Sequence, residues 1–189
     1  RMLEFVAAYL AVPMDEAVRM RAADLPRYGT TLEWLKARHG LRDESAYFEA
    51  VHPECEIAEL KPDPALRPYL LSLGLPLTLL TNAPMSHAER VLAFFGIEDI
   101  FLGVFDLTFH GGQGKPHPEC YRNTLAAVGW SVEETLFVDD HIKYVRGYRD
   151  IGGRAVLVDE TGEREAEARE EGFGYIRTIY GLSGVIPNY

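Results

Sequence analysis

Residues 136–140 read Leu136-Phe137-Val138-Asp139-Asp140, three apolar side chains followed by two carboxylates. A strand of a parallel sheet that is covered on both faces is continuously apolar, so this stretch predicts a short buried strand. Acidic residues at the carboxyl end of such a strand lie where open α/β sheets bind their ligands. Two adjacent carboxylates repel each other, which favours a hard cation such as Mg²⁺ beside them. A cap for the following helix is the other interpretation, and the stretch alone does not decide between the two.

Strands and helices alternate on both sides of this stretch. We expect short strands at 75–80, 103–107, 135–138, 154–158 and 175–179. We expect helices between them at 64–73, 86–95, 117–128, 141–150 and 163–171, the last of them a glutamate-rich, solvated helix. Such alternation requires crossover connections and predicts a parallel, Rossmann-like sheet.

The N-terminal third of the sequence has a different pattern of apolar residues. Apolar residues at helical spacing predict helices, with no strand, over residues 1–57. Thr30 and Glu33 match a capping box, and Gly40 ends the predicted helix at 31–39. The Pro-rich stretch 61–64 marks a boundary. We therefore expect an all-helical domain at 1–58 and an α/β core domain at 59–189.

Composition excludes several classes of partner. The chain has 189 residues and a net charge of −10, which argues against nucleic acid or an anionic membrane as the main partner. No apolar run is long enough to cross a bilayer. Two cysteines, Cys55 and Cys120, make no disulfide framework, so we expect a reducing cytoplasm. A monomer and a homodimer are both compatible with the sequence.

Three polar groups follow predicted strands or loops, in a fixed order. Thr81-Asn82 ends one strand, where a hydroxyl and main-chain N–H groups can meet an anion. Lys115 stands between a Gly-rich loop and a proline-started helix, which fixes its direction. Asp139-Asp140 ends a later strand. Taken singly, Thr81 reads more readily as a helix cap and Lys115 as a solvated surface lysine.

Together, the ordered set resembles motifs two to four of the haloacid dehalogenase-like (HAD) phosphohydrolase superfamily, and the helical segment before them resembles its C1-type cap. Further stretches are similar to the pyrimidine 5′-nucleotidase-like branch: residues 28–32, 51–52, 62–64 and 81–83 with His87.

The resemblance implies phosphoryl transfer through an aspartyl-phosphate with Mg²⁺, acting on a nucleoside monophosphate or a similar small phosphorylated metabolite. In that scheme Thr81, Asn82 and Lys115 bind the phosphate, with Thr81 and Lys115 counted as catalytic. Asp139 and Asp140 hold the metal. Tyr28, Thr31 and His141 are candidate substrate contacts.

The sequence departs from the pattern in two places. The first motif of the superfamily, Asp-x-Asp-x-Thr, is missing, and with it the nucleophile and the acid/base. We expect these residues to be an inactive fragment of a longer chain; a strand supplied by a partner and a degenerate, non-catalytic relative are the alternatives. Tyr144 stands where the family often has an Asn that supports the metal site, and a packed aromatic is its more usual role.

Two other functions keep the same fold. A non-catalytic phosphate-binding or interaction module would explain the missing nucleophile. A 2-haloacid dehalogenase would not need the acidic pair, so Asp139-Asp140 argues against it. Five histidines are too scattered along the sequence to predict a metal cluster: His52, His87, His110, His117 and His141.

Overall fold

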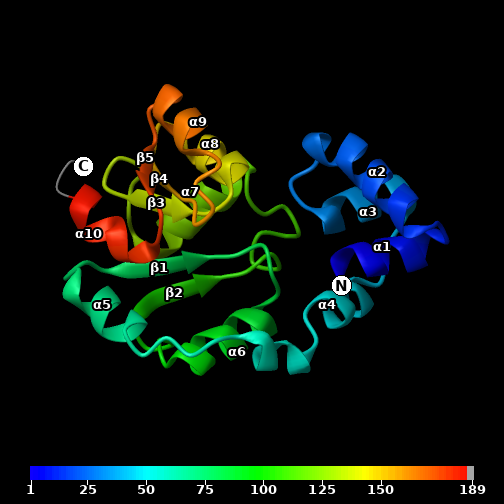
Figure 1. The fold of residues 1–189 in the computed structure, drawn as a ribbon, viewed down its shortest axis with the longest axis horizontal. Helices are drawn as coiled ribbons and strands as arrows, with labels where there is room; N and C mark the ends of the chain where they lie inside the picture. The colour runs from blue at the N-terminus through cyan, green and yellow to red at the C-terminus, as the bar shows by residue number, and fades with distance from the viewer. Residues whose placement is uncertain (187–189) are drawn as a thin grey trace. The chain divides into compact units, whose positions relative to one another are not determined.

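The computed structural model describes residues 1–186. Figure 1 shows its helices and strands in chain order. The N-terminal part is helical, with α1 (Met2–Leu10), α2 (Met14–Asp24), η1 (Leu25–Arg27), α3 (Thr31–His39), α4 (Glu44–Val51) and η2 (Glu54–Glu59). The next elements are α5 (Leu66–Ser72), β1 (Leu77–Leu80), α6 (Met85–Phe95), β2 (Phe101–Phe105), α7 (Pro118–Val128) and β3 (Leu136–Asp139). The last are α8 (Ile142–Asp150), β4 (Arg154–Val158), α9 (Glu165–Glu170), β5 (Gly174–Ile176), η3 (Ile179–Gly181) and α10 (Leu182–Val185).

The chain forms two compact units. Unit 1 comprises residues 1–64 and 79–114, and unit 2 comprises residues 65–78 and 115–189. The N-terminal helices therefore group with α6 and β2, and the division between the units falls inside β1. The predicted domains at 1–58 and 59–189 remain a prediction.

Helix α3 of unit 1 begins and ends at the residues that the sequence indicates. The Thr30 hydroxyl accepts a hydrogen bond from the Glu33 N–H at 3.1 Å, which satisfies one unpaired donor at the start of α3. The Glu33 carboxylate returns to the Gly29 N–H at 2.7 Å, one residue before the predicted partner. Gly40 ends the helix at φ 72°, a left-handed conformation that suits glycine.

A buried apolar cluster forms the core of unit 1. Trp34 and Leu35 of α3 and Val6 of α1 have no exposed surface. Leu107, which follows β2, is 2% exposed and packs in the same cluster. The Trp34 Nε1–H donates to the Asp24 carboxylate at 3.2 Å, so the one polar atom of this large side chain is paired.

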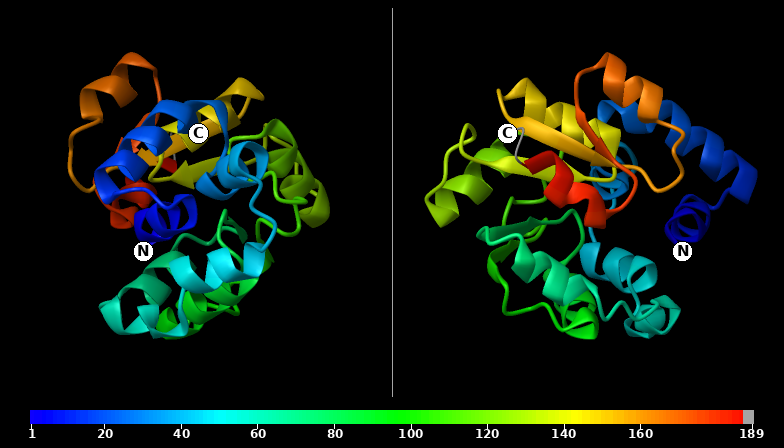
Figure 2. Two further views of the ribbon diagram at one scale, coloured as in Figure 1. Left: turned by 90° about the vertical axis from the view of Figure 1, so that its right-hand side faces the viewer. Right: turned by 60° about the vertical axis from the view of Figure 1, so that its left-hand side comes forward.

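Unit 2 is built on the three-stranded sheet β3-β4-β5. Both strand pairs are parallel, and Asp139 is in register with Leu157. Helix α8 packs against β3 and β4, and α9 and α10 pack against β5; these elements can be followed in Figure 2 from yellow to red. The central strand β4 is the best buried, with Val156 and Leu157 fully inaccessible.

The predicted α/β fold is confirmed, but the prediction of a buried strand before Asp139 is wrong, and the strand before Thr81 is no better buried. All four residues of β1 and all four of β3 are only partly buried. The reason is that, within residues 1–186, β1 pairs with β2 alone and β3 pairs with β4 alone, so each is an edge strand. The strands form two separate sheets and not one.

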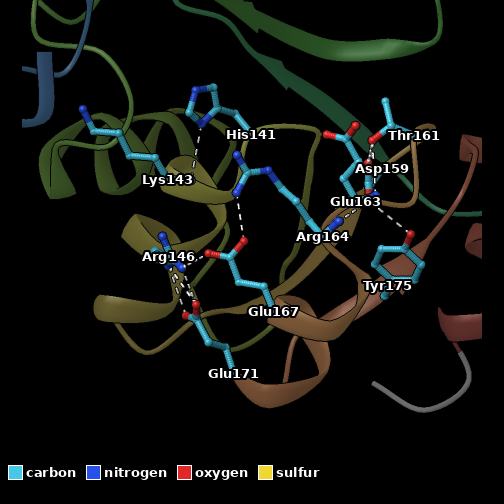
Figure 3. A network of polar contacts seen from close by, with 10 residues as sticks. All are labelled: His141, Lys143, Arg146, Asp159, Thr161, Glu163, Arg164, Glu167, Glu171 and Tyr175. Carbon is cyan, nitrogen blue, oxygen red and sulfur yellow. Dashed lines mark hydrogen bonds and ion pairs between the residues drawn. The ribbon is translucent and has the colours of Figure 1, made fainter. Parts of the chain in front are cut away.

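The glutamate-rich stretch is largely exposed, as expected, and two of its glutamates also form ion pairs with α8. Figure 3 shows Arg146 of α8 reaching the carboxylates of Glu167 and Glu171. Its Nη2 lies 2.6 Å from Glu167 Oε1, and its Nε donates to both oxygens of Glu171 at 3.1 Å. These ion pairs are partly exposed, so they orient α9 on α8 more than they stabilise the unit.

Candidate active site

The structure brings Lys115 and Asp139 of unit 2 together in a buried ion pair. Lys115 Nζ lies 2.7 Å from Asp139 Oδ2, and the two side chains are 10% and 7% exposed. Asp139 is the last residue of β3, and Lys115 lies shortly before α7. A buried carboxylate and a buried ammonium are costly singly, so this pair is a specific feature of the site.

Asp139 also makes the turn that starts α8. Its Oδ1 accepts a hydrogen bond from the His141 N–H at 2.8 Å. His141 is the N-cap of α8, and its Nδ1 accepts from the Lys143 N–H at 3.3 Å. The cap interpretation of Asp139 is therefore wrong, because its Oδ1 bonds the N–H of the cap residue His141 and not an N–H of the helix itself. The other oxygen faces Lys115.

Burial and charge act on Asp139 in opposite directions. Burial raises the pKa of its carboxyl group above the ordinary value, and the Lys115 ammonium works against that rise. The His141 N–H also favours the ionised form, whereas the adjacent Asp140 disfavours it. The pKa of a carboxyl group held in this way changes whenever the cation beside it is changed.

Tyr144 takes part in holding Lys115. Lys115 Nζ lies 5.1 Å from the centroid of the Tyr144 ring and 5.7 Å from that of Phe137, within the range of cation–π attraction. The Tyr144 ring also lies 4.5 Å from the His141 ring. Tyr144 is thus a packed aromatic at the site.

The main chain after Lys115 is fixed by close packing on α8. A Cβ atom at Gly147 would lie 2.7 Å from Pro116 Cβ and 2.9 Å from the Pro116 carbonyl oxygen. It would also lie 3.0 Å from the Tyr121 hydroxyl, which donates to the Tyr144 carbonyl oxygen at 2.8 Å. Only glycine lets the segment that carries Lys115 approach α8 this closely.

We expect Gly147→Ala to lower the free energy of unfolding by about 1–3 kcal/mol, because the added methyl group meets the Pro116 ring and carbonyl oxygen, which cannot turn aside. Equilibrium denaturation in urea measures the change. Gly184→Ala, in α10, is the matched control, since nothing lies within 4 Å of its added Cβ. Equal stabilities for the two variants would contradict the packing argument.

The acidic pair offers donors that fit Mg²⁺. Both side chains present carboxylate oxygens, the ligand type that Mg²⁺ prefers, and Asp140 is exposed beside the buried Asp139. Each Asp139 oxygen has one protein partner, which leaves acceptor capacity on both. The residues present can therefore supply two of the six oxygen ligands of Mg²⁺.

Thr81 and Asn82 belong to unit 1 and follow β1. The Thr81 hydroxyl accepts from the Ala83 N–H at 3.0 Å, and its own N–H donates to the Phe105 carbonyl at 2.9 Å. The helix-cap interpretation of Thr81 is wrong, because the Met85 N–H at the start of α6 donates instead to Asp106 Oδ2 at 3.1 Å.

The candidate substrate contacts lie in different surroundings. Thr31 of unit 1 is 4% exposed, and its hydroxyl is paired with Arg21 Nε at 2.8 Å. Tyr28 is partly buried and packs against the core cluster of unit 1. His141 is exposed next to Asp140. Their roles remain predictions.

The statement that the histidines are too scattered for a cluster is wrong for two of them. The rings of His52 and His87, both in unit 1, have centroids 4.2 Å apart, with Glu56 bonded to each. The four-residue spacing of His52 and Glu56 is the only local sequence signal for this cluster. His87 lies 31 residues beyond Glu56, so the sequence does not place it there.

Comparison with known proteins places the chain in a family. Residues 4–152 match the profile of the haloacid dehalogenase-like hydrolases. A phosphatase of Mycobacterium tuberculosis, MT3486, is 34% identical over 117 residues, which cover 60% of this chain and 49% of the relative. The chain thus spans about half the length of the curated relatives it matches, or less.

Two solved structures share the fold. A HAD phosphatase from Thermococcus onnurineus has a TM-score of 0.65 and 21% identity, and the match covers 98% of this chain and 86% of that one. The L-2-haloacid dehalogenase of Xanthobacter autotrophicus has a TM-score of 0.59 and 18% identity, covering 82% and 80%. With the profile match over most of its length, the chain belongs to the haloacid dehalogenase-like hydrolase family.

Proposed function

We propose that this chain is part of a Mg²⁺-dependent phosphomonoesterase that acts on small phosphorylated metabolites, nucleoside monophosphates first among them. The observation that carries the proposal is the buried Lys115–Asp139 pair with Asp140 beside it, at the carboxyl end of β3. The relationship to a phosphatase of M. tuberculosis supports it. The pyrimidine 5′-nucleotidase-like branch is the finer part of the proposal and rests on the motif resemblance alone.

Each residue has a role in that proposal. Lys115 carries its positive charge next to the reacting phosphate and favours the ionised form of Asp139. Asp139 and Asp140 would hold Mg²⁺, which when bound neutralises charge on the phosphoryl oxygens. The Thr81 hydroxyl and the main chain at Asn82 would orient those oxygens. Tyr28, Thr31 and His141 would contact the rest of the substrate.

The nucleophile is the part that these residues do not supply. No Asp-x-Asp pair occurs anywhere in the 189 residues. This is the observation that favours the second candidate, a non-catalytic phosphate-binding module. The acidic pair disfavours the third, a dehalogenase, since halide displacement has no use for a metal; the likeness to a dehalogenase at 18% identity is one of fold alone.

We also propose a cytoplasmic protein, either a monomer or a homodimer, that binds neither nucleic acid nor membranes. The net charge of −10 supports the exclusion of polyanions. No helix within residues 1–186 is long and apolar enough to span a bilayer.

The test compares the product of the complete reading frame with the 189-residue chain. Phosphate release is measured from nucleoside monophosphates and other small phosphomonoesters, with Mg²⁺ and with EDTA, and chloride release from 2-chloropropionate. We expect phosphate release by the complete product that stops in EDTA. Metal-independent chloride release would establish the dehalogenase. Phosphate binding without either reaction would establish the non-catalytic module.

A further inference from the structure

His52, Glu56 and His87 gather in unit 1. His52 ends α4, Glu56 lies in η2, and His87 lies in the first turn of α6. His87 Nδ1 is 2.7 Å from Glu56 Oε1, and His52 Nδ1 is 3.3 Å from Glu56 Oε2. One ligand atom from each of the three residues lies within 4.8 Å of the others. Two segments that lie 31 residues apart in the sequence thus converge on one point.

The three side chains have the exposure of a binding site. Glu56 is 8% exposed, while His52 and His87 are 24% and 25% exposed, so the carboxylate is buried and the rings reach the surface. The cluster therefore offers two imidazole rings and one carboxylate at a single place that is open to solvent.

Arg90 also binds the Glu56 carboxylate. Its Nη2 lies 2.8 Å from Glu56 Oε1 and 2.8 Å from the His52 carbonyl oxygen. A carboxylate oxygen accepts from more than one donor, and the His52 carbonyl keeps Arg90 in place if Glu56 turns toward another cation. The positive charge of Arg90 nevertheless repels a bound cation, so the site should bind a cation less tightly with Arg90 than without it.

We propose that His52, Glu56 and His87 form a second metal site, selective for a divalent transition ion of the zinc class. Two imidazoles and one carboxylate are the donors that such an ion takes, at about 2.0–2.2 Å. Closing the three atoms onto one ion requires small side-chain rotations, and the partial exposure of both rings leaves a fourth position to water. Mg²⁺, which prefers oxygen ligands, should not compete for this site.

The test is a titration of the 189-residue chain with Zn²⁺ against a chromophoric chelator, in excess Mg²⁺. We expect one Zn²⁺ per chain and a rise in the thermal midpoint with Zn²⁺ concentration, because an ion that binds only the folded state stabilises it. Co²⁺ provides a readout on the unaltered chain, through the intense visible bands of a four-coordinate site. No binding, or a six-coordinate Co²⁺ spectrum, would overturn the proposal.

Variants separate this site from the acidic pair. His52→Ala and His87→Ala are each expected to weaken Zn²⁺ binding by about tenfold or more. Arg90→Met should strengthen it, whereas a purely structural cluster predicts no gain. Asp139→Asn/Asp140→Asn and His117→Ala are the matched controls and should bind Zn²⁺ as the unaltered chain does. Loss of binding in the Asp139/Asp140 double variant alone would assign the ion to the acidic pair and refute the proposal.

Discussion

Lys115→Met is expected to lower the free energy of unfolding by about 3–5 kcal/mol at neutral pH, the usual result of breaking a buried ion pair. The change leaves the Asp139 carboxylate, 7% exposed, without the cation 2.7 Å away. Urea denaturation monitored by tryptophan fluorescence measures it. Lys61→Met, at an exposed position, is the control and should change little.

The loss of stability in Lys115→Met should depend on pH in a defined direction. The pKa of Asp139 is already raised by burial, and removing Lys115 raises it further. A carboxyl group whose pKa is higher in the folded state binds its proton more tightly there, so the variant should gain stability as the pH falls from 7 toward the ordinary carboxyl range. Lys115→Met/Asp139→Asn should recover most of the loss at pH 7. A double variant as unstable as the single one would show that the lysine stem, and not the charge pair, is responsible.

Asp139→Asn is expected to lower phosphate release by the complete protein by about 10²–10³-fold, the scale on which one electrostatic group of an active site acts. The amide removes a negative ligand for Mg²⁺ and the counter-charge of Lys115 while it keeps the shape of the side chain. Turnover under saturating Mg²⁺ and the apparent Mg²⁺ affinity are the two measurements.

Asp150→Asn is the matched control, because Asp150 is exposed at the end of α8, the helix that follows Asp139. It should keep full activity. Asp140→Asn should weaken Mg²⁺ binding with little effect on stability, since Asp140 is exposed. Full activity of Asp139→Asn would remove this carboxylate from the proposed metal site.

The sequence predicted those parts of the fold that local signals specify. The Thr30–Glu33 cap and Gly40 define α3 at both ends, and the apolar residues 154–158 define β4. The predicted strand at 103–107 lies two residues too late, because Asp106 and Leu107 turn inward to cap α6 and to fill the core. Helix α10 was not predicted, since four residues with a glycine carry too little helical pattern.

The site residues also fall into two groups: those that sequence motifs predict and those that only the fold brings together. Lys115 and Asp139 were predicted from the order of the motifs. The structure brings these two residues, which lie 24 positions apart in the sequence, into direct contact. Tyr144 as a partner of Lys115 could not be predicted, because it depends on how α8 faces the segment before α7. Likewise, only the packing of η2 on α6 brings His87 to Glu56; no spacing in the sequence encodes it.

The edge position of β3 has a consequence for the behaviour of the chain in solution. Its partly buried Leu136, Phe137 and Val138 lie on a strand that presents one row of main-chain N–H and C=O groups without a strand partner among residues 1–186. Such an edge is a template for pairing with another copy. Mutual repulsion from the net charge of −10 opposes that encounter near neutral pH. Mild acid, which neutralises carboxylates before it unfolds the sheets, is therefore the condition under which these molecules should aggregate through their strands.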